Sequence, residues 1–228
     1  HSSRRAQVDP FIVMDVMEAA RAAEAAGRHI IHMEVGQPST PAPEGARRAL
    51  ASAMETDALG YTVALGLPAL RERIAGLYAD WYGVSLDPAR GIVTGGSSSA
   101  FLLAFTALFD AGDRVAMGEP GYPSYRQILR ALSLDPVGIP TRPEDRYQPR
   151  PGAIPADVQG LIVASPANPS GTMLGREPLA ALIGGAHDRG VSFISDEIYH
   201  VLHYGDRAVS ALAISDDVYV INSLSTYY

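Results

Sequence analysis

The pattern that most constrains the fold begins at residue 91, where short apolar segments alternate with helix-favouring ones. Residues 161–164 (LIVA) and 218–221 (VYVI) are continuous apolar runs. Strands with one face in water alternate apolar and polar residues, so continuous runs indicate strands buried on both faces, as in a parallel sheet covered by helices. We therefore predict an α/β fold with a mostly parallel sheet sandwiched by helices.

Apolar periodicity, proline and glycine mark the individual elements. Gly27 follows an Ala-rich segment at the position of a helix C′ glycine, and Pro68 lies near the first turn of another predicted helix. A Pro- and charge-rich loop is predicted over 139–156. The predicted helices span 14–26, 44–54, 67–81, 97–109, 125–132 and 179–189, and the predicted strands span 91–94, 114–120, 160–164, 191–197 and 218–225.

Composition excludes several classes of function. The formal net charge is −7, which disfavours a nucleic-acid surface, and no apolar run approaches the roughly 18 residues that a membrane span requires. The chain has no cysteine, so it forms neither disulfides nor thiolate metal sites. No apolar segment follows the N-terminal HSSRR, so no secretory signal is expected, and a cytoplasmic protein without nucleic-acid or membrane partners is predicted.

In a parallel α/β sheet, ligands bind at the carboxyl ends of the strands. The first of these ends, Gly95-Gly96-Ser97-Ser98, opens a helix, where free amides and the helix dipole favour an anion such as phosphate. An ordinary Gly-Ser helix entry with a serine cap explains the same residues equally well. The segment is neither a P-loop nor a GxGxxG fingerprint.

The other strand ends carry an aromatic ring, an amide and a carboxylate. Tyr122 either covers the sheet end or offers a face to a flat ring, and Asn168 is either a turn residue or a donor to a bound ring. Asp196 ends an apolar strand, where a buried carboxylate needs a partner; an arginine or a bound cationic heterocycle would serve, and Tyr199 could reach the same pocket. Two serines, Ser223 and Ser225, follow the last predicted strand.

These segments occur in an order that resembles the class I/II aminotransferases, enzymes of fold type I that use pyridoxal 5′-phosphate (PLP). The resemblance covers the chain from about Phe11 to its last residue. Each motif is weak alone, and the order of all seven carries the resemblance: MEVGQP, GYTVALGLPALR, VTGGSSSA, EPGYPSY, SPANPSGT, SDEIY and NSLS.

The resemblance implies a role for each candidate residue. Asp196 would keep the ring nitrogen of PLP protonated, and Tyr122 would stack on the ring. Gly36 would approach the substrate carboxylate, and Tyr61 would reach the phosphate of a neighbouring subunit, which implies a homodimer. Asn168 and Tyr199 would bind the ring hydroxyl of PLP. The phosphate group of PLP would be bound by Gly96, Ser97, Ser98, Ser223 and Ser225.

One residue of the family pattern is missing. The motif that ends in Ser-Leu-Ser continues in the family with the lysine that binds PLP covalently, but all 18 basic residues of this chain are arginines. Three explanations stay open: a modified lysine is omitted between Ser225 and Thr226, Thr226 replaces it in an inactive variant, or the chain is a short pseudoenzyme. In each case we expect a fragment that lacks the family's C-terminal part.

The resemblance predicts a PLP-dependent aminotransferase acting on an amino acid and a 2-oxo acid. The alternatives are a PLP-dependent lyase or decarboxylase of the same fold, and a non-catalytic PLP-binding regulatory module. Residues 1–45 are expected to belong to a small domain and 46–228 to the large PLP-binding domain. His200 and His203 have an i, i+3 spacing without a carboxylate motif, so no metal site is expected.

Overall fold

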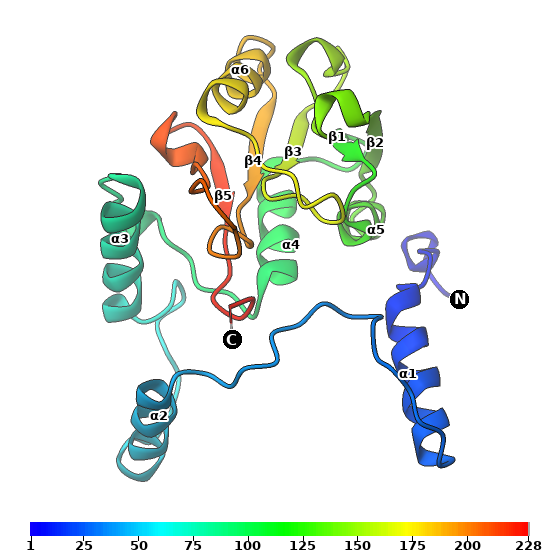
Figure 1. Cartoon of the computed structure of the whole chain (residues 1–228). Helices are drawn as coiled ribbons and strands as arrows, with labels where there is room; N and C mark the ends of the chain where they lie inside the picture. Colours follow the sequence, from blue (N-terminus) through cyan, green and yellow to red (C-terminus); the bar gives the residue numbers. More distant parts are fainter. Residues whose placement is uncertain (228) are drawn as a thin grey trace.

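The computed structural model describes residues 1–227 and shows an α/β fold (Figure 1). A five-stranded sheet lies in its centre, and helices cover both faces. The helices are α1 (Ile12–Ala25), α2 (Glu44–Thr56), α3 (Pro68–Tyr82), α4 (Ser97–Leu108), α5 (Pro123–Ala131) and α6 (Arg176–His187); the strands are β1 (Arg114–Glu119), β2 (Asp135–Pro140), β3 (Gly160–Ala164), β4 (Ser192–Asp196) and β5 (Tyr219–Ile221).

All strand pairs are parallel, in agreement with the predicted parallel sheet, and the strand order is β2-β1-β3-β4-β5. At the carboxyl edge of the sheet, Asp196 pairs with Ala164 on one side and with Ile221 on the other. Parallel strands need crossover connections, which α5 provides between β1 and β2 and α6 between β3 and β4. The crossovers leave the loops after the strands together at one edge of the sheet.

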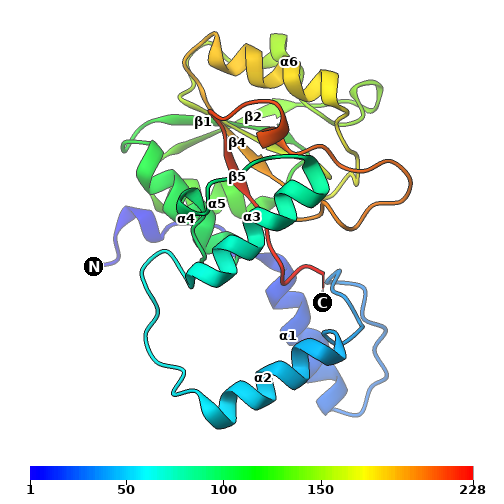
Figure 2. The same cartoon turned by 90° about the vertical axis from the view of Figure 1, so that its left-hand side faces the viewer.

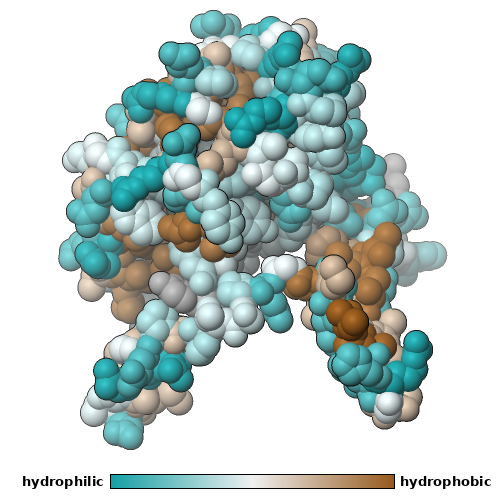
Figure 3. Space-filling view, in the orientation of Figure 1, coloured by the Kyte–Doolittle hydropathy of each residue, from teal (hydrophilic) through white to brown (hydrophobic). Residues whose placement is uncertain are grey.

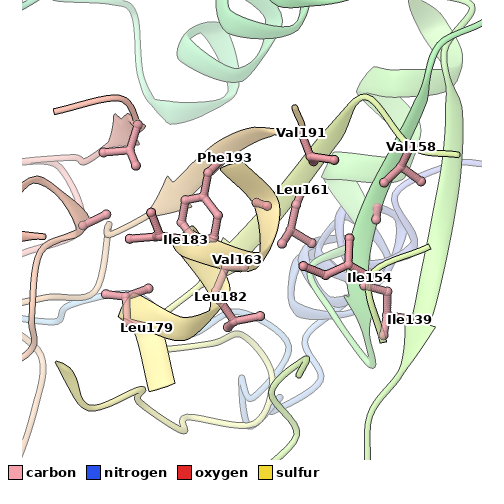
Figure 4. Packing of buried hydrophobic residues seen from close by; sticks show 14 of the residues in the cluster. Ile139, Ile154, Val158, Leu161, Val163, Leu179, Leu182, Ile183, Val191 and Phe193 are labelled. Carbon is pink, nitrogen blue, oxygen red and sulfur yellow. The ribbon is translucent and has the colours of Figure 1, made fainter. Parts of the chain in front are cut away.

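Two hydrophobic layers hold the sheet between its helices. Leu161 and Phe193 face α6 (Figure 4), whereas the adjacent residues Ile162 and Ile194 face α4 and α5. Successive side chains of a strand point to opposite faces, so a strand buried on both faces needs apolar residues at adjacent positions. Each fully buried Leu, Ile or Phe contributes roughly 1.5–3 kcal/mol.

Two predicted strands and one strand that was not predicted need correction. Residues 91–94 form no strand, because Val93 N–H donates to the Leu65 carbonyl at 3.0 Å and an open groove of about 610 Å³ separates this segment from β5. β2 was not predicted, since part of it falls in the predicted loop. The last predicted strand ends at Ile221, and the segment from Ser223 to Thr226, hereafter the serine turn, is not a strand and turns at Ser225 and Thr226.

The N-terminal arm, residues 1–67, projects from the sheet body, residues 97–221 (Figures 1 and 2). Its contacts with the body include an edge-to-face pair of Phe11 and Tyr122 and an ion pair of Asp9 and Arg130 at 3.1 Å. Apolar side chains stay uncovered along the arm, as the brown surface of α1 shows (Figure 3); the larger ones on its two helices are Ile12, Met14, Val16, Met17, Leu50 and Met54.

Helices that could cross a membrane were sought in residues 1–227, and none is both long enough and apolar enough.

Candidate cofactor-binding site

Asp196 is the most deeply buried of the predicted site residues, with 3% of its surface exposed. Its Oδ2 accepts a hydrogen bond from the Tyr125 hydroxyl, and its Oδ1 accepts one from Ile198 N–H at 3.2 Å. Burial raises the pKa of Asp196 to about 6, although both hydrogen bonds act in the opposite direction. No arginine of the described residues pairs with this carboxylate, so a protein ion pair does not explain its burial.

Tyr125 is a site residue that the sequence interpretation missed. It follows Tyr122 by three residues at the start of α5, which places both rings on the same side of the helix. The two rings meet edge to face with centroids 5.4 Å apart. Only the EPGYPSY motif, with two tyrosines one helical turn apart, indicated that a second ring would lie close to the first.

Tyr199 and Asn168 meet beside Asp196, as the sequence interpretation expected of a common pocket. Burial raises the pKa of Tyr199, whereas a hydrogen bond with the Asn168 side chain lowers it and the nearby Asp196 raises it. Asn168 and Tyr122 line one small cavity. Four of the predicted residues, Tyr122, Asn168, Asp196 and Tyr199, thus lie near one another after β1, β3 and β4.

The first turn of α4 has free backbone donors. Gly96 precedes the helix with φ +97°, and no side chain of the described residues caps it. The first amide bonded within the helix is that of Ala100, which donates to the Gly96 carbonyl at 3.2 Å, so the amides of Ser97 and Ser98 remain for an anion. Although the predicted strand before it is absent, the predicted helix start is correct.

The second predicted part of the phosphate site lies in the turn after β5. Ser223 Oγ and Ser225 Oγ are hydrogen-bonded at 2.8 Å. Asn222, at the start of this turn, and Ala100, in the first turn of α4, line the same groove. The groove thus runs from the first turn of α4 to Asn222, although the predicted phosphate residues themselves are not among its lining residues. Thr226, which lies at or just after the expected position of the lysine, is half-buried at the end of that turn.

Two predicted residues do not join this group. Tyr61 is fully exposed on the N-terminal arm, and Gly36 lies in the exposed segment between α1 and α2. An added Cβ at Gly36 would meet no atom within 4 Å, so nothing within residues 1–227 requires a glycine there. Their predicted roles, toward a neighbouring subunit and a substrate, remain predictions.

Glu197 and His200 form a second buried polar group next to the site. Burial raises the pKa of Glu197 to about 7, despite hydrogen bonds to its Oε1 from Ala211 N–H at 2.7 Å and from the hydroxyls of Ser195 and Ser210. Burial also lowers the pKa of His200 to about 4. His200 Nδ1 and the Tyr82 hydroxyl are hydrogen-bonded at 2.8 Å, so this nitrogen already has a protein partner.

His203 Nδ1 donates to the His200 carbonyl at 2.6 Å. Among residues 1–227, no group of three or more metal-ligating side chains comes together.

Comparison with known proteins gives these residues a family context. The profile described as "Aminotransferase class I and II" matches residues 28–228. The valine–pyruvate aminotransferase of Mycobacterium tuberculosis is 46% identical over 98% of this chain and 59% of its own length. An aspartate aminotransferase of Geobacillus stearothermophilus is 31% identical over 98% of this chain and 59% of its own length.

Solved structures show the same fold. A crystal structure of an aminotransferase from Mycobacterium tuberculosis superimposes with a TM-score of 0.94 at 45% identity, covering all of this chain and 60% of the other. The aspartate aminotransferase of Thermus thermophilus with maleate gives a TM-score of 0.94 at 29% identity, over 100% and 61% of the two chains. The chain spans about 60% of the length of these relatives, and it belongs to the aminotransferase class I and II family.

Proposed function

We propose that this chain forms the PLP-binding part of an aminotransferase that moves an amino group between an amino acid and a 2-oxo acid. The observation that carries the proposal is the Asp196 carboxylate, which is buried at the carboxyl edge of the sheet without a cationic partner among residues 1–227. A buried carboxylate is stabilised by a cation, and the protonated pyridine nitrogen of PLP is one.

The residues present fit PLP at both ends of the molecule. At the ring end, Asp196 would hold the proton of the ring nitrogen, while Tyr125 orients the carboxylate through its hydroxyl. Tyr122 would cover the ring, and Asn168 with Tyr199 would bind the ring oxygen. At the phosphate end lie the free amides of α4 and the hydroxyls of the serine turn: Gly96, Ser97, Ser98, Ser223 and Ser225.

PLP, when bound, supplies an electron-withdrawing ring that stabilises negative charge at the substrate α-carbon. The residues of this chain prepare the site for that chemistry. Asp196 keeps a proton at the ring nitrogen, and Asn168 and Tyr199 donate to the ring oxygen and favour its anionic form. Because the chain contains no lysine, it lacks the family's group for covalent attachment and for proton transfer at the α-carbon.

The lack of lysine favours a second candidate, a protein that binds PLP without catalysis. Both candidates require the same ring and phosphate contacts and differ in whether a lysine is present at or just before Thr226. The homodimer with Tyr61 in a shared site, the role of Gly36, the domain boundary near residue 45 and a cytoplasmic location are proposed on the resemblance and the composition.

Binding of PLP to wild type and Asp196→Asn tests the proposal by equilibrium dialysis. The asparagine keeps the shape but cannot neutralise a protonated ring, so we expect PLP to bind at least about tenfold more weakly. Asp216→Asn removes an exposed carboxylate of the loop before β5 and serves as the matched control. Equal affinity for all three proteins would refute the role of Asp196.

Thr226→Lys separates the two candidates. If position 226 is the lysine position of an aminotransferase, the variant should form a covalent PLP adduct that borohydride reduction traps and mass spectrometry detects. Leu224→Lys, on the exposed side of the same turn, controls for nonspecific labelling of lysine. An adduct in neither variant, or in both alike, would favour the non-catalytic candidate.

A further inference from the structure

Asn222 is the first residue beyond the sheet, directly after the pair of Ile221 with Asp196. Its side chain makes three hydrogen bonds. Oδ1 accepts from Ser223 N–H at 2.8 Å and from the Tyr227 hydroxyl at 3.0 Å, and Nδ2 donates to the Tyr78 hydroxyl at 3.3 Å. An asparagine amide has two donor and two acceptor positions, so most of its capacity is used here.

The partners of Asn222 come from both ends of the serine turn and from α3. Ser223 begins the turn and Tyr227 follows it, so Oδ1 closes the turn on itself. Tyr78 is 4% exposed and packs against Tyr82, with ring centroids 5.1 Å apart. Because Tyr78 is buried in α3, its hydroxyl has a fixed position. The hydrogen bond from Asn222 therefore connects the turn to α3, 144 residues away in sequence.

We propose that Asn222 is a positioning residue that holds the turn from Ser223 to Thr226 in the shape that binds the phosphate group of PLP. The inference rests on the proposed function. Asn222 itself need not touch the ligand: it fixes the backbone that carries the two serine hydroxyls, which lie 2.8 Å apart. The same restraint sets the direction in which residue 226 leaves the turn.

The amide is suited to this position because it accepts from two donors and donates to a third group. A leucine of similar size would leave Ser223 N–H, the Tyr227 hydroxyl and the Tyr78 hydroxyl without this partner. An aspartate would still accept from Ser223 and Tyr227, and the Tyr78 hydroxyl can rotate to donate to it. Asn222→Asp should therefore keep most of the PLP affinity that Asn222→Leu loses.

The test compares PLP with pyridoxal, which lacks the phosphate, in binding to the 228-residue protein. Asn222→Leu should weaken PLP binding about tenfold and leave pyridoxal binding within about twofold, because the ring end is untouched. Asn222→Asp should lose about threefold or less for PLP. Leu224→Ala, in the same turn with an exposed side chain, should bind both ligands as wild type does.

A second measurement needs no ligand. Amide hydrogen exchange at Ser223 should be at least about tenfold faster in Asn222→Leu than in wild type, while the amides of β3 keep their protection. If Asn222→Leu does not fold, Tyr78→Phe removes only the anchoring hydroxyl and should weaken PLP binding about threefold, again without an effect on pyridoxal.

The outcomes separate the inference from the proposed function. Equal losses of PLP and pyridoxal in Asn222→Leu, or no loss of PLP, would overturn the role of Asn222 while leaving the proposed function in place. If wild type binds PLP no better than pyridoxal, the turn does not hold the phosphate, so the inference fails together with the phosphate contacts of the proposed function. If wild type binds neither, the proposed function fails and the inference with it.

Discussion

Helices α6 and α2 have nearly equal lengths but opposite surroundings. The 12 residues of α6 bury four side chains against the sheet, whereas the 13 residues of α2 bury none within the described part of the chain. Both contain several alanines, but α6 also contains Pro178 and two glycines, Gly184 and Gly185, which are poor helix formers. Local propensity therefore does not favour α6 over α2. Only the sheet body adds tertiary packing, which usually supplies most of the stability of a helix in a protein.

The largest expected contrast between the two regions is the cost of truncating an apolar side chain. Phe105 is 0% exposed on α4, and Phe105→Ala should lower the free energy of unfolding by about 3–5 kcal/mol because it opens a cavity. Leu50 is 60% exposed on α2, and Leu50→Ala should change it by less than about 0.5 kcal/mol. Urea denaturation measures both, and similar values would mean that α2 is covered in solution.

A buried carboxyl group in the sheet body should make its stability depend on pH. Because the pKa of Glu197 in the folded protein is about 7, above its ordinary value of 4.5, the folded state holds this proton more tightly than the unfolded state does. Its stabilising contribution is therefore complete below pH 4.5 and lost as the pH rises through 7. The loss is on the order of 3 kcal/mol.

Glu197→Gln keeps the acceptor for Ala211 N–H but cannot ionise. We expect the free energy of unfolding of the variant to fall less between pH 4.5 and 7 than that of wild type, as measured by urea denaturation at several pH values. Glu55→Gln, on exposed α2, is the control for the loss of one carboxylate. Parallel curves for wild type and Glu197→Gln would contradict the expectation.

Glycine-to-alanine substitutions should change stability in opposite directions in the two regions. A Cβ at Gly160, at the start of β3, would lie 2.3 Å from the Phe109 ring, so Gly160→Ala should destabilise by about 1–3 kcal/mol. A Cβ at Gly45 in α2 meets nothing within 4 Å, and Gly45→Ala should stabilise that helix by up to about 1 kcal/mol. Circular dichroism during thermal unfolding reports both effects, and the same sign at both positions would contradict the contrast.

The smallest effect is expected where the N-terminal arm touches the body. Arg130 and Asp9 are exposed enough for water to screen their ion pair, so Arg130→Ala should cost no more than about 1 kcal/mol. The loss should shrink further in high salt. A larger, salt-independent loss in urea denaturation would indicate that the arm is attached by more than this pair and the Phe11–Tyr122 contact.

The elements of the sheet body were largely predictable because period and propensity agree there. β3 has no polar side chain, β4 has Phe193 and Ile194 at its centre, and the helix after Gly96 begins where the glycine and serines predicted. β2 was missed because DPVGIP contains two prolines and a glycine, which strands tolerate at an edge of a sheet. The strand expected at 91–94 was wrong because an apolar run forms a strand only beside a partner.

The candidate site was predictable as a set of positions, but not as a set of contacts. Asp196, Tyr122 and Asn168 were found because polar or aromatic residues after buried strands stand out. Tyr125 was missed because its role depends on a hydrogen bond to a residue 71 positions away. The bond between Asn222 and Tyr78 has no local signal for the same reason.

The alternation of apolar and helix-favouring segments was enough to predict the α/β fold and the residues that follow β1, β3 and β4, because both depend on local patterns of apolar and turn residues. Tertiary structure alone decided that Asp196 is buried without an arginine, that Tyr125 holds it and that Asn222 ties the serine turn to α3. Burial and hydrogen bonding between distant segments exist only after the chain has packed, so they set the electrostatics of the site independently of any local pattern.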